Sequence, residues 1–187
     1  MNPYGNIPQE NWEDVTKKLV EFHPLSNTIV DICLKSWSSI LGGTINSFLN
    51  MKIKEMSISP QATGALLHDV IPEYISKNIK GFRKGTGKEK DVVCEYDESL
   101  SFEIKTSSQK SIYGNRSYVK SEEGKSKSGY YLTINFEKIS SNDPKIYKIQ
   151  MGWLQHSDWK AQKSETGQQA SLTKEAKSLK LITLYKI

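Results

Sequence analysis

Three residues in one short segment have types and spacing suited to phosphodiester chemistry. The segment KDVVCEYDESLSFEIKTS, residues 90–107, contains Asp91, Glu103 and Lys105. In its second half apolar residues alternate with polar ones. A β-strand there would place Glu103 and Lys105 together on a polar face and bury the reverse face.

The position of Asp91 depends on the turn between the two strands of this segment. We expect strands at Asp91–Tyr96 and Leu100–Thr106, paired antiparallel through a tight turn. A turn with an odd number of residues puts Asp91 opposite Glu103 or Lys105, on the same face, whereas an even turn puts Asp91 on the core face. We therefore predict a three-residue or bulged turn.

Such a cluster is suited to hydrolysis assisted by a divalent cation. Mg²⁺ prefers one or two carboxylates together with water and phosphate oxygens, so Asp91 and Glu103 could hold it. Lys105 could orient the attacking water or neutralise charge in the transition state. Two neighbouring carboxylates repel each other unless a cation lies between them. The three residues together predict a Mg²⁺-dependent phosphodiesterase.

The Glu-x-Lys pattern alone is not specific. It occurs again as Glu123/Lys125 in a polar loop and as Glu175/Lys177 in an expected C-terminal helix or loop. Only the pair at Glu103 lies on an apolar strand that follows another strand opening with Asp. The competing interpretation is a solvated strand face that carries ordinary charges.

The N-terminal part of the chain has helical periodicity. We predict an amphipathic helix at Glu10–Phe22 and a second helix from residue 28, broken or bent by Gly42 and Gly43, with a further piece through Phe48. A third helix should begin with Ser59 as its N-cap and continue to about Asn78. A glycine- and lysine-rich loop follows it.

The period then changes to alternation. Besides the two strands above, we predict strands at Tyr130–Phe136, Tyr147–Leu154 and Lys180–Tyr185, in a mostly meandering sheet. The segment between residues 107 and 129 is a long polar loop, and loops of that length usually have a function. The 187 residues suit one α/β or α+β domain, 1–187, with residues 1–80 mainly helical and residues 90–187 mainly sheet.

Composition excludes several classes of protein. The formal net charge of +5 permits a polyanionic partner, and basic residues flank both sides of the hairpin. No apolar run is long enough to span a membrane and the N-terminus has no signal-peptide pattern. Two isolated cysteines suggest reduced thiols in a cytoplasmic protein. GFRKGTGKEKD lacks the Gly-Lys-Ser/Thr ending of a phosphate-binding loop, so we expect no nucleotide cofactor.

The hairpin resembles the active site of the PD-(D/E)XK nuclease superfamily. Asp91 corresponds to its first acid, Glu103 to its second and Lys105 to its lysine, while Lys90 stands where many members have proline. A closer similarity to ScaI-type restriction endonucleases is carried by SSQKSIYGNRSYVKS, GYYLTINFEK, IQMGWLQHSDW and TGQQASL. Together with the hairpin these stretches span roughly residues 60–175.

The resemblance implies a fold and an activity. The fold would be α/β and restriction-endonuclease-like, with N-terminal helices packed on a central mixed β-sheet. The activity would be Mg²⁺-dependent cleavage of double-stranded DNA at a short palindrome by a homodimer, leaving 5′-phosphate ends.

The resemblance also suggests further site residues. Related nucleases often add an acid from the preceding helix to the metal site, and Glu73 is the candidate, although it could equally be a solvent-facing helix residue. Side chains after the second strand are of types that read base edges or contact phosphates. The expected DNA-contacting residues are Gln109, Asn115, Arg116, Ser117 and Tyr118.

Two other functions fit the same residues. A structure-specific nuclease of the junction-resolvase or repair type would use the same hairpin chemistry, although the glutamine-rich loops favour sequence reading. A non-catalytic nucleic-acid-binding domain would carry Glu103 and Lys105 by coincidence. Mg²⁺-dependent cleavage that is lost in Lys105→Ala would exclude this last function.

Overall fold

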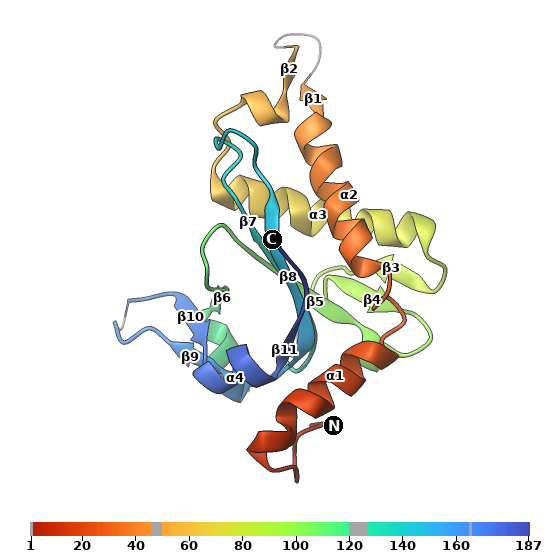
Figure 1. Cartoon of the computed structure of the whole chain (residues 1–187), viewed down its shortest axis with the longest axis vertical. Coiled ribbons are helices and arrows are strands. Elements are labelled where there is room, and N and C mark those ends of the chain that lie inside the picture. The colour runs from red at the N-terminus through yellow and green to blue at the C-terminus, as the bar shows by residue number, and fades with distance from the viewer. Residues whose placement is uncertain (1, 46–49, 120–126, 165) are drawn as a thin grey trace.

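A six-stranded mixed sheet forms the centre of the molecule, with order β11-β8-β7-β5-β4-β3. The computed structural model describes residues 2–45, 50–119, 127–164 and 166–187 (Figure 1). Its helices are α1 (Trp12–Phe22), α2 (Ile29–Gly42), α3 (Pro60–Asn78) and α4 (Lys174–Leu179), with single 3₁₀ turns η1 (Gln9–Asn11), η2 (Ile53–Glu55), η3 (Glu98–Leu100), η4 (Arg116–Val119) and η5 (His156–Asp158). Its strands are β1 (Thr44–Ile45), β2 (Met51–Lys52), β3 (Phe82–Lys84), β4 (Val92–Cys94), β5 (Phe102–Ser107), β6 (Tyr113–Asn115), β7 (Gly129–Phe136), β8 (Ile146–Leu154), β9 (Trp159–Ala161), β10 (Gln169–Leu172) and β11 (Leu181–Lys186).

Helix α3 begins and ends as its sequence predicts. The Ser59 hydroxyl accepts a hydrogen bond from the Ala62 amide at 3.2 Å, which satisfies one of the free N–H groups of the first turn. The helix buries an apolar stripe completely, formed by Leu67, Ile71 and Ile75. These residues recur every four positions, so they lie on one side of the helix and fix the side that faces the sheet.

The second predicted helix is shorter than the periodicity suggests. Helix α2 ends at Gly42, and the chain turns into a small hairpin of β1 and β2. The predicted helical piece beyond the glycines is therefore wrong at residues 44–45, and Phe48 lies outside the described residues. The paired glycines end the helix because glycine loses more backbone entropy in a helix than any other residue.

The central sheet is mixed, as predicted, but it is not a meander throughout. Strands β5 and β7 pair in parallel, from Phe102 opposite Tyr130 to Ser107 opposite Asn135, whereas the remaining neighbours are antiparallel. Parallel pairing is possible because the chain leaves the sheet after β5 and returns, before β7, to the end of the sheet at which β5 began. Alternating residues predicted the strands β7, β8 and β11 to within one residue at each end.

Strand β3 was not predicted. Residues 82–84, assigned from the sequence to a glycine- and lysine-rich loop, pair antiparallel with residues 92–94. Phe82 is 3% exposed and supplies the apolar anchor for this edge strand. Two basic residues on a three-residue strand hide the alternation, and charged residues are common on edge strands.

Two apolar clusters lie on opposite faces of the sheet. One face, with Phe102, Ile104 and Leu132 among its residues, packs against α1, α2 and α3 in a core shared by the helical and strand-rich parts of the chain. The other face carries Tyr131 into a smaller cluster with Trp159. That cluster is covered by a second sheet, of order β6-β10-β9, which the sequence did not reveal.

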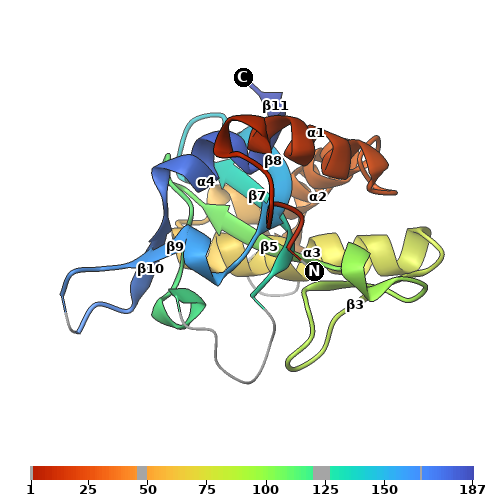
Figure 2. The same ribbon diagram turned by 90° about the horizontal axis from the view of Figure 1, so that it is seen from below.

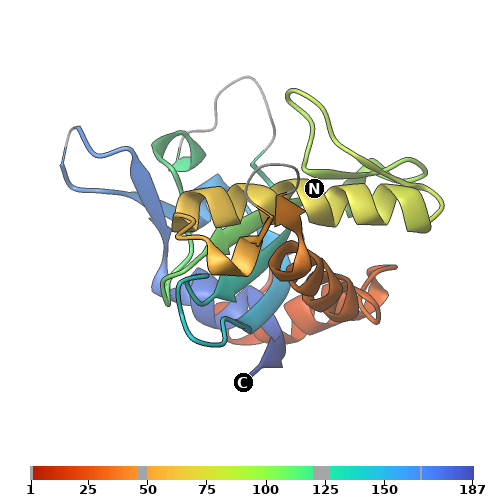
Figure 3. The ribbon, with the colours of Figure 1, turned by 90° about the horizontal axis from the view of Figure 1, so that it is seen from above.

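Two segments project from the body of the molecule. Figure 2 shows the β9–β10 hairpin extending at the left and the loop between β3 and β4 at the lower right. Figure 3, viewed from the opposite side, shows α3 running across the region between them. Within the described ranges, none of the helices combines the length and apolar character that crossing a membrane requires.

Candidate active site

The junction of β4 and β5 brings Asp91 to Glu103. Val92 pairs with Phe102, and continuing this register by one residue places Asp91 opposite Glu103. The connection is longer than the predicted three-residue turn: it spans residues 95–101 and contains η3, in which Asp97 caps the Ser99 amide. The number of residues is still odd, and this parity keeps Asp91 on the polar face.

One oxygen of the Asp91 carboxylate is approached by groups from two elements. Its Oδ2 accepts a hydrogen bond from the Ile104 amide at 2.7 Å, where the β4–β5 ladder has ended. The same Oδ2 lies 3.6 Å from Nδ1 of His68, on α3. The carboxylate therefore links the sheet to the helix that crosses it.

The electrostatics around Asp91 favour its charged form. Burial raises the pKa of Asp91, but contacts with His68, the Ile104 amide and Glu103 outweigh burial and hold the pKa well below its usual range. The nearby Lys105 ammonium acts in the same direction. Asp91 is therefore a carboxylate at neutral pH.

Glu103 is fully buried beside Asp91. The contact between the two carboxyl groups is one of the causes of the lowered pKa of Asp91. Two touching carboxyl groups in low dielectric surroundings cannot both be ionised without a proton or a cation between them. The pair is thus a place of unmet negative charge, of the kind that a divalent cation neutralises.

Lys105 is supported from the second sheet. Its ammonium lies 4.9 Å from the centre of the Tyr118 ring, a cation–π distance. The Tyr118 ring in turn packs edge-on against Trp159 of β9, with centroids 5.0 Å apart. The aromatic residues below Lys105 limit the space in which its side chain can move.

The donor set suits Mg²⁺ better than a metal that needs a complete protein cage. In the described part of the chain, no three or more His, Cys, Asp or Glu side chains are grouped so that they could hold a metal ion. Asp91 and Glu103 supply two carboxylates, and Mg²⁺ normally completes its shell with water and substrate phosphate oxygens. The residues present therefore fit this ion.

Glu73 lies apart from the carboxyl pair. Its side chain is half exposed and forms an ion pair with Lys77 at 2.9 Å on the same helix. The Lys77 ammonium lowers the pKa of Glu73. His68 is five residues earlier on α3, about 140° around the helix, so the side of α3 that faces Asp91 is not the side that carries Glu73.

Gln109 lines a pocket that also includes His68, the neighbour of Asp91. The pocket has a volume of about 670 Å³, and its walls include Gln61 and His68 of α3 and residues 106–109 at the end of β5. The backbone carbonyl of Gln109 accepts a hydrogen bond from the side-chain Nδ2 of the buried Asn135 at 2.7 Å, which fixes the backbone at Gln109. Gln169 of β10 forms part of the opposite wall.

The other expected DNA-contacting residues divide into two kinds. Asn115 and Ser117 are exposed and joined by a hydrogen bond from the Ser117 amide to Asn115 Oδ1. Arg116 instead donates from Nη1 to the carbonyls of Ser164 and Gly167, so it holds the β9–β10 hairpin. Tyr118, 7% exposed, lies under Lys105 and not on the outer surface.

The other two Glu-x-Lys pairs differ in their surroundings. Glu123 and Lys125 lie outside the described residues. Glu175 and Lys177 belong to the short helix α4, which packs against α1 and β11 and not against β5. Glu175 and Lys177 are thus matched controls for Glu103 and Lys105.

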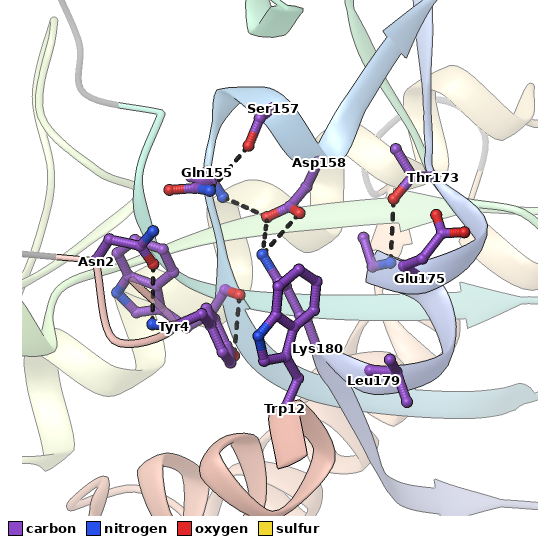
Figure 4. Close-up of polar contacts among 12 residues, drawn as sticks. Asn2, Tyr4, Trp12, Gln155, Ser157, Asp158, Thr173, Glu175, Leu179 and Lys180 are labelled. Atoms are coloured by element: carbon purple, nitrogen blue, oxygen red, sulfur yellow. Dashed lines mark hydrogen bonds and ion pairs between the residues drawn. The ribbon is translucent and has the colours of Figure 1, made fainter. Parts of the chain in front are cut away.

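The sequence did not point to two further contacts between polar side chains. His68 flanks the buried stripe of α3, and its place on the helix before the hairpin was the available signal. Lys180, 1% exposed, pairs with Asp158 at 2.8 and 3.2 Å between the rings of Tyr4 and Trp12 (Figure 4). Nothing in the sequence around Lys180 distinguishes it from a surface lysine.

Helices on one face of a mixed sheet, with an Asp-Glu-Lys cluster on the other, define a restriction-endonuclease-like protein. The chain belongs to the ScaI restriction endonuclease family, whose family model matches residues 2–185. It is 39% identical over 193 residues to the type II restriction enzyme ScaI of Streptomyces caespitosus, covering 98% of this chain and 85% of that enzyme. No solved structure matches. The chain is accordingly a type II restriction endonuclease, a site-specific deoxyribonuclease.

Proposed function

We propose that this endonuclease cuts double-stranded DNA by Mg²⁺-dependent hydrolysis with Asp91, Glu103 and Lys105. The strand register that places Asp91 opposite Glu103, on the face that also carries Lys105, is the observation that supports it. Asp91 and Glu103 would hold the ion. When bound, Mg²⁺ stabilises charge on the phosphate and lowers the pKa of a bound water.

The protein groups would act on an in-line displacement. A water molecule loses one proton to the solvent, and its oxygen forms a bond to phosphorus while the bond from phosphorus to the 3′ oxygen breaks. The 3′ oxygen takes up a proton from the solvent. The products are a 3′-hydroxyl and a 5′-phosphate. Lys105, held over the Tyr118 ring, would orient the attacking water and offset the negative charge that develops on the phosphate.

DNA would lie along the pocket next to His68. Gln109, Asn115 and Ser117 would contact DNA directly, since all three are exposed. Arg116 would act through the β9–β10 hairpin that it holds, and Tyr118 through Lys105. Glu73 is left out of the metal site because its carboxylate pairs with Lys77.

A homodimer that reads a short palindrome follows from the same activity. Cutting both strands of a two-fold symmetric site calls for two active sites related by that symmetry. Each copy would be one nuclease domain spanning residues 1–187, since its helices and strands share a core. DNA cleavage within the cell would place the protein in the cytoplasm.

Digestion of a mapped plasmid tests the activity. With Mg²⁺ we expect discrete fragments whose sequenced ends carry 5′-phosphates at one palindrome, and with EDTA we expect none. Glu103→Gln should lose cleavage while the matched variant Glu175→Gln retains it. Random degradation, cleavage in EDTA, or wild-type cleavage by Glu103→Gln would each contradict the proposal.

A further inference from the structure

His68 lies where α3 meets the carboxyl pair. Its Nδ1 is 3.6 Å from Asp91 Oδ2, and the His68 and Asp91 side chains are 31% and 22% exposed. His68 also lines the pocket proposed to hold DNA. Hydrogen bonds in unliganded active sites are often longer than in the working complex. The separation is therefore compatible with a donor–acceptor pair.

The two donors to Asp91 come from different layers. The Ile104 amide belongs to β5 and His68 to α3, yet both approach the same oxygen, Oδ2. A second donor beside the Ile104 amide would resist rotation of the carboxylate about its Cβ–Cγ bond. A carboxylate that binds a metal needs such support, because its orientation sets where the ion lies.

The close contact between Gly64 and Thr106 sets the distance between α3 and β5. A Cβ on Gly64 would lie 2.7 Å from Oγ1 of Thr106, closer than such atoms approach. Threonine has few side-chain rotamers, so Thr106 cannot easily move aside. Gly64 is one helical turn before His68 and on the same side of α3. The close approach of Gly64 to β5 therefore carries His68 toward Asp91.

We propose that His68 is a positioning residue that donates a hydrogen bond from Nδ1 to Asp91 and holds this carboxylate beside Glu103. The inference rests on the proposed function, because it gives Asp91 a role in binding the metal. His68 acts through Asp91 and does not itself contact the ion. In keeping with this, the described residues contain no three-residue metal-ligand group that includes His68.

Three substitutions at His68 separate a donor from a metal ligand. Asparagine places an amide N–H close to the position of Nδ1, so His68→Asn should cut within about threefold of the wild type. His68→Ala removes the donor and should lower kcat by about 10- to 100-fold, with a small change in the KM for DNA. His68→Asp places a carboxylate against Asp91 and should lower kcat at least as much as His68→Ala does.

Other patterns overturn the inference. Wild-type cleavage by His68→Ala shows that the donor is not needed. Retention in His68→Asp with loss in His68→Asn shows that His68 is a metal ligand. Lys105→Ala is assayed in parallel: if it also cuts normally, the proposed function has failed, whereas an inactive Lys105→Ala beside an active His68→Ala removes only the His68 inference.

Two measurements do not depend on cleavage. Mn²⁺ binding to the protein–DNA complex, followed by electron paramagnetic resonance, should weaken about tenfold in His68→Ala and stay unchanged in His68→Asn. Nitrogen-15 spectra of the metal-free protein should show a proton on Nδ1 of His68. Unchanged Mn²⁺ affinity in His68→Ala, or an Nδ1 without a proton, would contradict the proposal.

The glycine contact has its own matched control. Gly64→Ala should push α3 away from Thr106 and change kcat and Mn²⁺ affinity in the same direction as His68→Ala. Gly42, the last residue of α2, has open space around the position of a Cβ, so Gly42→Ala should leave both unchanged. If Gly64→Ala and Gly42→Ala had the same kcat and the same Mn²⁺ affinity, the contact of Gly64 with Thr106 would not be needed to position His68.

Discussion

Two acidic sites in this molecule have opposite designs. Asp158 and Lys180 are both buried, 2.8 Å apart, and neutralise each other between two aromatic rings. Asp91 and Glu103 form a pair of acids in contact, with Lys105 as the nearby cation. When ionised, the first site sums to zero and the second to a formal charge of −1. The first is complete within the protein, whereas the second gains from an added cation.

The difference shows how one fold separates stability from activity. A buried pair with a matched charge joins η5 to the end of α4 and packs against aromatic rings near the N-terminus (Figure 4). The unmatched pair lies at the point where β4 leaves β5, and His68, the neighbour of Asp91, lines the pocket of about 670 Å³. The excess carboxylate disfavours the metal-free fold, and the same excess would attract the ion required for cleavage.

Removing Lys105 should lower the cleavage rate, whereas removing Lys180 should lower the stability of the fold. The loss of cleavage is expected to be the larger of the two effects. Lys105→Ala should lower the single-turnover cleavage rate by about 10³-fold, because the charge that develops on the phosphate is no longer offset. Its unfolding free energy should change little. Lys177 on α4 is the matched control, and Lys177→Ala should cleave DNA at the wild-type rate. Cleavage by Lys105→Ala within tenfold of the wild type would remove the contrast.

Lys180→Met should affect stability instead. It leaves Asp158 buried without its partner, which costs about 3–5 kcal/mol in urea denaturation. Cleavage per folded molecule should be unchanged. The double variant with Lys180→Met and Asp158→Leu should recover most of the loss, since an apolar pair replaces the ion pair. A single variant as stable as the wild type would mean that the pair contributes nothing.

Neutralising one acid at each site should change stability in opposite directions. Asp158→Asn should destabilise the fold by about 3 kcal/mol, because Lys180 loses its counter-charge. In metal-free buffer Glu103→Gln should stabilise it by about 1 kcal/mol, because the buried pair no longer has to take up a proton to avoid two adjacent negative charges. Calorimetric unfolding of both variants gives the sign of the change in unfolding free energy for each. The same sign for both would contradict the comparison.

The smallest expected effect is a dependence on pH. Because the folded-state pKa of Asp91 is below its unfolded value, its contribution to stability is present above the unfolded pKa and is lost as the pH falls through the folded one. Wild type should exceed Asp91→Asn by about 1 kcal/mol at neutral pH, and the gap should narrow below about pH 4. A gap that widens in acid would contradict this direction.

The placement of Asp91 beside Glu103 could be predicted from the sequence because it depends only on local geometry. Alternation fixes the face of Glu103 and Lys105, and an odd connection fixes that of Asp91, whatever the exact shape of the turn. Alternation does not identify the neighbouring strand, so the parallel pairing of β5 with β7 was missed. His68 and Lys180 acquire their partners through packing between distant segments, which no local pattern records.

The contact between Thr16 and Leu179 has a consequence for synthesis. The Thr16 hydroxyl donates to the Leu179 carbonyl at 2.7 Å across a sequence separation of 163 residues. A ribosome adding about 5–20 residues per second makes Leu179 some 10–30 s after Thr16. Until β11 has been synthesised and pairs with it, β8 is an edge strand with unpaired backbone N–H and C=O groups. Such an edge can pair with a strand of another chain. Chaperone protection would matter most in that interval.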